Sequence, residues 1–383
     1  MKRILYFVFW VIFCTSCGNF LEEYSQDLVY AQSCEDLDEI LIGNGYMAQP
    51  TTPSYFSYGD KAFYYPYLHV MDDDIEEYLT GNANISSSIN PVTTLRNFYI
   101  WAKEPFMRIS GLTFRDYDWK RMYEHIGYLN VIISYVKEFH EDSEEMRHRI
   151  LGEAQFLRAG YYFMLVNLYA NPYSKETADA TMGVPLNLTE YIEEGYFSRD
   201  PVAAVYRQIV TDLENAIVNL SGIKQPTIYR VNEKAARALL SRVYLYMGEW
   251  QLVIDECDEI IKMGCSLWDL NNFDPGTATF GCKRDYFLAK ESPEIFFTQG
   301  AGVVGLLMDN QNITSQTRYR ASDELYGIYS KYEKDGILDL RKNCFFEMSK
   351  RDNGYFFVRK NPMVDATVFD SFLLRSGEIY LNK

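Results

Sequence analysis

The sequence predicts a mostly α-helical protein in which a scaffold of packed helical pairs carries a large, loop-rich region. Three observations support this fold class. Between about residues 116 and 264, apolar residues recur at spacings of three and four, the period of amphipathic helices. The stretches 44–115 and 265–371 show little periodicity and are rich in turn-forming and aromatic residues. No run rich in Pro, Ser and Gly divides the chain, so residues 17–383 are expected to form a single domain.

Three long helices are predicted in the first part of the scaffold. The first covers residues 116–139. The second is expected to start at a capping pair formed by Asp142 and Glu145. Asp200 is expected to cap the third, with Pro201 at its first position, where a missing N–H costs little. Their apolar stripes include Trp119, Ile126, Leu129, Leu157, Tyr161, Tyr206 and Leu213.

A fourth and a fifth helix are expected to form a tight antiparallel pair. Asn232 caps the first of them, Gly248 ends it in a left-handed conformation, and the second starts near Trp250. The spacing of large and small residues matches the tetratricopeptide pattern, in which stacked helical pairs bury one continuous core. Two positions depart from that pattern: Arg237 stands where Trp is common, and Val253 stands where a small residue is usual.

The remaining parts of the chain are less regular. Short strand-like runs occur at 295–297 and 355–358. The segment 372–383 starts an amphipathic helix, which we assign to the scaffold, and it ends without a cap. From this abrupt end we expect the chain to be truncated relative to its relatives.

The N-terminus has the pattern of a bacterial lipoprotein signal peptide. Two cationic residues precede an apolar run over 4–13, and small residues lead to Cys17. A membrane-spanning helix would need ~20 apolar residues, about twice this run. We therefore expect cleavage of residues 1–16 and lipidation of Cys17, with an ordinary secretion signal as the alternative. Cys14 departs from the pattern, because it stands where such signals usually carry Leu.

Several segments resemble the SusD/RagB family of outer-membrane lipoproteins from Bacteroidota. The central one is 153–169, with the sequence EAQFLRAGYYFMLVNLY. Further segments agree with the family in the same order along the chain. They are 17–22, 183–186, 205–214, 235–250, 293–297, 339–341 and 375–381.

This resemblance implies a SusD-like fold and a cell-surface, lipid-anchored nutrient receptor. Such a receptor binds its ligand and delivers it to a SusC-like TonB-dependent outer-membrane transporter. Family members commonly bind glycans for polysaccharide utilisation, and some bind peptides. The partners implied for this chain are an oligosaccharide or polysaccharide (alternatively a peptide), the transporter, and outer-membrane lipid through acylated Cys17.

Aromatic and planar polar side chains in the two irregular stretches are the candidate ligand contacts. The chain holds 32 Tyr, 24 Phe and 5 Trp. Tyr and Trp combine a flat apolar face with a polar group, which suits stacking on sugar rings, although packing in the core uses the same residues. Trp101 and Tyr99 are the preferred candidates. The full set is Arg96, Asn97, Tyr99, Trp101, Trp268, Arg318 and Tyr319.

We expect neither catalysis nor a cofactor. No G-x-S-x-G, H-E-x-x-H or phosphate-loop motif occurs. His69 near the acidic run 72–74 suggests a metal site, but the run lacks calcium-loop spacing, so a solvated turn or helix start is preferred and no metal is expected. The formal net charge of −16 disfavours binding to nucleic acid.

Five cysteines follow the signal segment, and they contain no C-x-x-C pair. Most are expected to be buried small hydrophobic residues, and disulfide pairing among them stays open. They are Cys34, Cys257, Cys265, Cys282 and Cys344.

Three functions stay open at this stage. The first is a glycan-binding lipoprotein of a transporter complex. The second is a RagB-type receptor for peptides in the same architecture. The third is a tetratricopeptide-type adaptor that binds proteins in a helical groove. The position of the exposed aromatic side chains discriminates between them, because a flat aromatic surface on the loop region favours a glycan.

Overall fold

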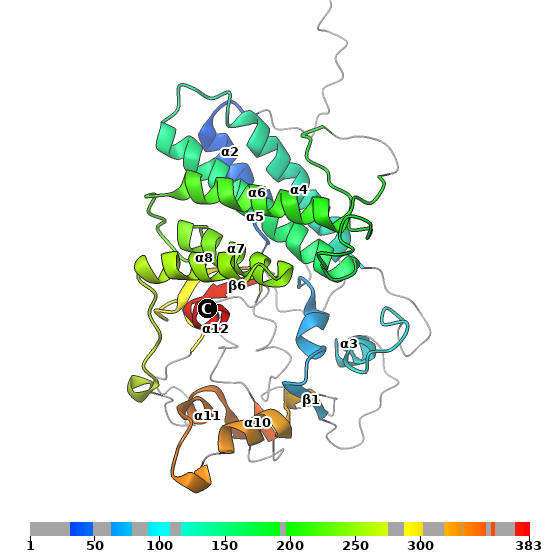
Figure 1. Ribbon diagram of the computed structural model, residues 1–383, viewed down its shortest axis with the longest axis vertical. Helices are drawn as coiled ribbons and strands as arrows, with labels where there is room; N and C mark the ends of the chain where they lie inside the picture. The colour runs from blue at the N-terminus through cyan, green and yellow to red at the C-terminus, as the bar shows by residue number, and fades with distance from the viewer. Residues whose placement is uncertain are drawn as a thin grey trace, which may run out of the picture.

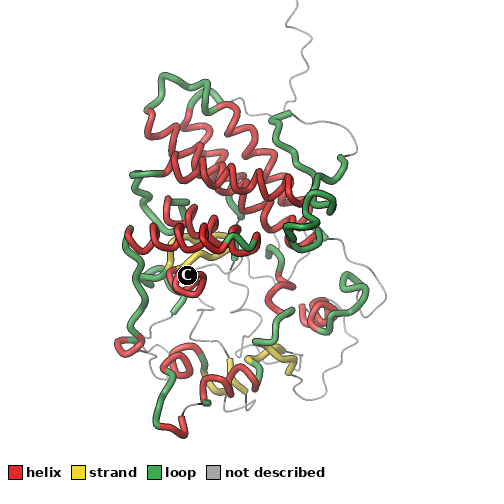
Figure 2. Tube along the Cα trace, viewed as in Figure 1, coloured by secondary structure: helices red, strands yellow, loops and turns green. Residues whose placement is uncertain are grey.

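A computed structural model describes most of the helical scaffold and parts of both irregular stretches. The predicted mostly α-helical, tetratricopeptide-like fold is confirmed (Figures 1 and 2). Cys17, Cys282 and the signal segment lie outside the described residues. Within those residues, no helix is both long enough and apolar enough to cross a bilayer. The described ranges are 31–48, 63–78, 91–107, 116–191, 197–274, 287–301, 318–331, 333–349, 354–356 and 372–383.

Five long helices form the scaffold, and each packs against the next along the chain (Figure 1). The helix α5 is buried on nearly every side, between α4 and α6. A short N-terminal helix and a π-helical turn pack against α4 and α5. These elements are α2 (Cys34–Ile40), η1 (Leu41–Gly45), α4 (Asp118–Tyr135), α5 (Glu144–Tyr169), α6 (Val202–Leu220), α7 (Glu233–Met247) and α8 (Trp250–Lys262).

The predicted boundaries of the tetratricopeptide-like pair are confirmed. The Asn232 side chain accepts a hydrogen bond from the Ala235 N–H at 3.0 Å, and Gly248 adopts φ 70°. Arg237, at the position where Trp is common, pairs with Glu233 at 3.1 Å and with Glu256 of α8 at 2.9 Å. An ion pair therefore links the two helices there.

Two predicted helix caps are wrong. Ser143, not Asp142, caps α5, with its hydroxyl accepting from the Met146 N–H at 3.2 Å. The Asp142 carboxylate accepts from the Cys34 N–H at 2.7 Å. A backbone N–H from a distant segment is thus bound to the carboxylate that was predicted to cap the helix.

The second error concerns α6. Its N-cap residue is Pro201, which has no side chain to accept a hydrogen bond. The Asp200 carboxylate instead accepts from the Leu186 N–H at 2.7 Å, and this contact fastens the loop before α6.

The described strands form three short antiparallel pairs. β1 (Ile75–Tyr78) pairs with β3 (Arg318–Ala321), and β2 (Ile295–Gln299) pairs with β6 (Phe372–Arg375). β4 (Glu347–Ser349) pairs with β5 (Gly354–Phe356). The first two pairs join segments that are far apart in the sequence.

The helix predicted over 372–383 is only partly correct. Phe372 and Leu374 alternate with more exposed neighbours, so the first four residues form β6. The rest forms α12 (Ser376–Asn382), which packs on α7 and α8. The other described helices are η2 (Pro66–Val70), α3 (Pro91–Tyr99), η3 (Leu270–Asn272), α10 (Asp323–Ser330), η4 (Glu333–Asp335) and α11 (Leu340–Phe345).

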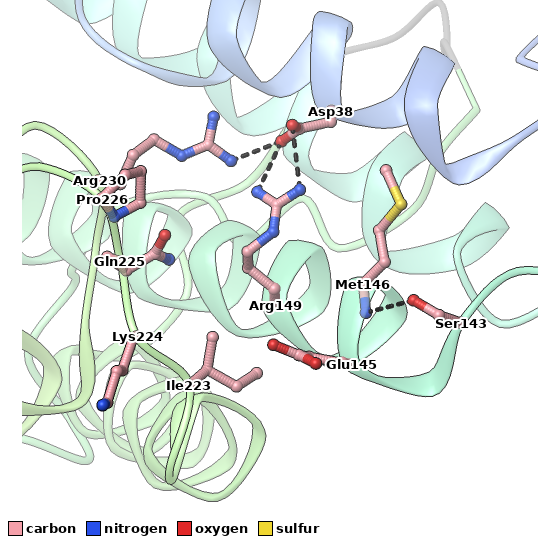
Figure 3. A pocket seen from close by; sticks show the side chains of 10 residues that line it. All are labelled: Asp38, Ser143, Glu145, Met146, Arg149, Ile223, Lys224, Gln225, Pro226 and Arg230. Carbon is pink, nitrogen blue, oxygen red and sulfur yellow. Dashed lines mark hydrogen bonds and ion pairs between the residues drawn. The ribbon is translucent and has the colours of Figure 1, made fainter.

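A buried ion network holds the N-terminal segment on the scaffold. Glu153 of α5 is fully buried, and its carboxylate pairs with Arg149 at 3.1 Å and with Arg230 at 2.8 Å. The Tyr46 hydroxyl also donates to it. Both arginines reach Asp38 of α2 as well (Figure 3). These hydrogen bonds hold the pKa of Asp38 below its usual range, although burial opposes the shift.

Replacing Glu153 with Ala is expected to reduce the free energy of unfolding by about 3–5 kcal/mol, because two partly buried arginines lose one of their two carboxylate partners. Urea denaturation measures this loss. The matched control is Glu124→Ala, which removes an exposed pair with Lys120 and is expected to cost less than about 0.5 kcal/mol. Equal effects of the two substitutions would contradict the importance of this network.

Candidate functional site

The candidate site is a surface that we call the aromatic edge, formed by η2, α3 and the β1–β3 ladder. These elements lie together beside the scaffold, on the side away from α2 (Figure 1). β1 belongs to the first irregular stretch and β3 to the second, and their register places Glu77 opposite Tyr319. The ladder therefore unites the two stretches from which ligand contacts were predicted.

Two charged residues of α4 fasten the start of the aromatic edge to the scaffold. The Asp118 carboxylate accepts from the Tyr65 N–H at 3.0 Å. The Arg121 guanidinium donates to the Phe63 carbonyl at 2.9 Å and pairs with Asp118. Tyr65 adopts φ 47°, a conformation that is costly for a side chain of this size. The contacts from α4 compensate for that cost.

His125, on the same face of α4, makes a third attachment. Its Nε2 lies 3.0 Å from the Tyr64 hydroxyl and its Nδ1 lies 2.5 Å from the Asn44 carbonyl. The carbonyl requires a proton on Nδ1, so Nε2 accepts from the tyrosine. Burial lowers the pKa of His125 below its ordinary value, and the nearby Arg121 adds to this shift while the Asn44 carbonyl opposes it.

Stacked aromatic rings support α3 on η2. The rings of Tyr67 and Phe98 are parallel, with centroids 4.4 Å apart. The Phe106 ring packs edge-on against Phe98 at 5.1 Å. Tyr67 and Phe98 are buried, so these aromatic residues form the base of the edge and not its outer surface.

Glu77 connects α3 to the ladder through two of its groups. Its N–H donates to the Tyr99 hydroxyl at 3.1 Å. Its carboxylate oxygens accept from Arg96 Nε at 3.2 and 3.3 Å. The Tyr99 ring lies 5.4 Å from the ring of Tyr319, which is fully buried. Burial raises the pKa of the Tyr319 hydroxyl.

Trp101 is the most exposed tryptophan among the described residues, at 71%. It lies in the turn after α3 with φ 50°, another left-handed residue that is not glycine. The turn is braced because the Trp101 N–H donates to the Phe98 carbonyl at 3.0 Å and the Asn97 carboxamide donates to the Met107 carbonyl. A strained residue that displays a large aromatic ring to solvent is typical of functional sites.

The structure brings six of the seven predicted residues to the aromatic edge. Arg96, Asn97, Tyr99 and Trp101 lie on α3 and its turn. Arg318 and Tyr319 lie on β3.

Trp268 belongs to a different cluster. Its ring packs with Phe273 at 5.3 Å and with Phe287 at 6.3 Å, and its backbone N–H donates to the Glu294 carboxylate at 2.9 Å.

Sequence reasoning missed Glu77. Glu77 is the last acidic residue of the stretch 72–77, and the sequence does not distinguish it from the other Asp and Glu residues there. No local signal marked it, because the sequence of Ile75–Tyr78 has two adjacent glutamates and lacks the alternation of a half-buried strand.

Two adjoining hollows lie elsewhere, around the loop between α6 and α7. One, of about 430 Å³, is lined by Asp38, Arg149 and Arg230 together with Gln225 and Lys224 (Figure 3). The other, of about 680 Å³, shares that loop. No aromatic side chain lines the first, and its Asp38 and two arginines are paired with one another. The buried Phe296 lines the second, and neither hollow includes a predicted ligand residue.

The described acidic residues and cysteines show no metal centre. Over these parts of the chain, no three His, Cys, Asp or Glu side chains are grouped to hold a metal. Asp72 accepts from the Asp74 N–H at 3.1 Å, in a local turn. The four described cysteines form no disulfide, and three of them are buried; they are Cys34, Cys257, Cys265 and Cys344, with Cys265 partly exposed.

Residues 71–245 match a SusD-like family model whose description is starch-binding, associating with the outer membrane. This range includes β1, α3 and most of the scaffold. Over these residues the chain is similar to the SusD-like family. A SusD-like protein of Formosa agariphila is 26% identical over 268 residues, which cover 68% of this chain and 46% of that relative. This chain thus spans about half the length of that relative.

Solved structures share the SusD-like fold. A SusD superfamily protein of Bacteroides thetaiotaomicron has a TM-score of 0.64 and 19% identity, and the match covers 91% of this chain and 75% of that one. A SusD-like carbohydrate-binding protein of Bacteroides vulgatus has a TM-score of 0.64 and 16% identity, with coverage of 91% and 70%.

The attachment through His125 is expected to make stability depend on pH. Because its pKa is lowered, His125 binds a proton at lower pH in the folded protein than in the unfolded chain, which binds one below about pH 6.5. The free energy of unfolding should therefore fall by about 1 kcal/mol between pH 7 and pH 5.5, and His125→Gln should reduce this dependence. Urea denaturation at several pH values tests this, with the partly exposed His148→Gln as control. An unchanged slope in His125→Gln would contradict the assignment.

Proposed function

We propose that this SusD-like protein binds a glycan at the aromatic edge, outside the cell, and delivers it to a SusC-like TonB-dependent transporter. The observation that supports binding most directly is Trp101, which is largely exposed on a braced turn. The starch-binding description of the family and the carbohydrate-binding relative of the same fold agree with this proposal.

The chemistry of the aromatic edge suits a sugar. One face of a pyranose ring carries C–H groups and packs on an indole, and its hydroxyls need planar donors and acceptors. Arg96 lies on α3 near the Trp101 turn with its side chain 38% exposed, and its Nη groups make no hydrogen bond with any described residue. Tyr99 and the buried Tyr319 support this surface from below.

The role we propose is binding without catalysis. The family description names a binding property and a location, and the aromatic edge offers a platform held in place by hydrogen bonds and ring packing. The hollows around the α6–α7 loop carry ion pairs that serve the scaffold.

The location we propose is the outer membrane surface, with acyl chains on Cys17 as the anchor. The signal pattern in the sequence supports this, and the family is associated with the outer membrane. One acyl chain binds a membrane only weakly, so stable anchoring needs more than one.

Lipidation can be tested by growing cells with a tagged fatty acid. The wild-type protein and Cys14→Ala are expected to take up the label, because Cys14 is removed with the signal. Cys17→Ala is expected to remain unlabelled. A labelled Cys17→Ala protein would exclude this anchor.

Trp101→Ala is expected to weaken glycan binding at least about tenfold, because the main stacking surface is lost. Isothermal titration against a panel of polysaccharides, including starch, measures the effect. Trp250→Ala is the matched control, since Trp250 is 64% exposed but lies on α8, and its affinity should be unchanged. Absence of binding to every glycan, with binding to peptides, would favour the RagB-type alternative.

A further inference from the structure

Two cationic side chains of the aromatic edge, Arg96 and Arg320, are compensated by carboxylates. Arg96 is held by Glu77, whose side chain is only 13% exposed. Arg320 of β3 pairs with Glu76 and with Asp323. Guanidinium groups that carry a carboxylate partner keep their hydrogen-bond donors but lose most of their attraction for an anion.

The overall charge of this surface is acidic. The segments 63–78, 91–107 and 318–331 together contain eight Asp and Glu residues and five Lys and Arg residues. The exposed Lys103 has no ion pair with a described residue, but an isolated exposed charge contributes little. The whole chain carries a formal net charge of −16. A polyanionic ligand would therefore approach against the field of the protein.

The geometry of the Arg96–Glu77 pair suits hydroxyl groups. Both Glu77 oxygens contact Arg96 Nε, which leaves the two Nη groups as free donors among the described residues. The carboxylate adds acceptor capacity beside them. Neighbouring hydroxyls of a sugar can use a donor and an acceptor together, whereas a sugar carboxylate or sulfate would be repelled by Glu77.

The side chains of Glu76 and Glu77 lie on opposite faces of β1. Successive residues of a strand point to opposite sides, and accordingly Glu76 pairs with Arg320 while Glu77 pairs with Arg96. Only Glu77 is connected to α3, through both Arg96 and Tyr99.

We propose that Arg96 and Glu77 form a charge-compensated subsite that selects uncharged sugars over uronate or sulfated ones. This inference rests on glycan binding at the aromatic edge and specifies the class of glycan. Glu77 acts as the specificity residue, because its carboxylate cancels the charge of Arg96 and holds the guanidinium in place.

The test is isothermal titration of the full chain with two sets of oligosaccharides of equal length. The neutral set contains gluco- and manno-oligosaccharides, and the anionic set contains oligogalacturonates and sulfated galacto-oligosaccharides. The neutral set is expected to bind at least tenfold more tightly, and its Kd should change less than twofold between 20 and 300 mM NaCl. The tenfold difference is about what one charge interaction contributes. The affinity for a neutral sugar should change little with salt, because salt screens interactions between charges.

Glu77→Gln is expected to shift the ratio of anionic to neutral affinity at least fivefold toward the anionic set, because the positive charge of Arg96 is no longer compensated. Glu76→Gln is the matched control, and it should leave the ratio unchanged, as should Lys103→Ala. If Glu77→Gln does not fold, Arg96→Gln provides the opposite test, with an expected shift toward the neutral set. Thermal unfolding of each variant verifies its fold.

The outcomes separate the two proposals. Tighter binding of the anionic set by the wild-type protein would overturn this inference while leaving glycan binding intact. An unchanged ratio in Glu77→Gln would also overturn it. Absence of binding to both sets would overturn the proposed function itself.

Discussion

The arrangement of the whole scaffold depends on the buried carboxylate of Glu153. Three segments donate hydrogen bonds to it: Tyr46 from the N-terminal segment, Arg149 from α5, and Arg230 from the loop between α6 and α7. A buried charge without partners costs several kcal/mol, so these segments must assemble together. Residues 31–48 are therefore an integral part of the helical core.

A second buried ion pair, between Arg158 and Asp212, connects α5 to α6. Arg158 binds Asp212 of α6 through two parallel hydrogen bonds of 2.8 and 2.7 Å, and it also reaches Asn130 of α4. Asn130 in turn donates to the carbonyls of Asn187 and Thr189. Because α5 is buried on nearly all sides, its polar residues set the register of its neighbours, and apolar packing alone would specify that register less sharply.

The aromatic edge is connected to this rigid core by a series of specific contacts. Asp118 and Arg121 of α4 form hydrogen bonds with the backbone before η2. The stacked rings of Tyr67 and Phe98 then hold α3 against η2. Glu77 joins α3 to the ladder between the two irregular stretches. The exposed ring of Trp101 thus rests on a chain of contacts that begins in the scaffold, and such support keeps a binding surface in one geometry.

Local patterns in the sequence were sufficient to predict the helical class and the tetratricopeptide-like pair. Periodicity, the Asn232 cap and the Gly248 stop are local, since each involves residues within one or two turns. The misassigned caps, Asp142 and Asp200, show the limit of such reasoning. A sequence shows which N–H groups lie nearby along the chain but not those that distant segments bring to the same carboxylate.

The sequence by itself therefore determined the type of each long helix and which stretches carry aromatic and planar polar residues. Only the tertiary structure decided which of those residues face solvent. Trp101 is exposed, Tyr319 is buried beneath Tyr99, and Trp268 packs into a separate cluster. The physical reason is that exposure depends on contacts between segments that no local pattern connects, such as the pairing of β1 with β3 around Tyr319 and the packing of Phe287 on Trp268.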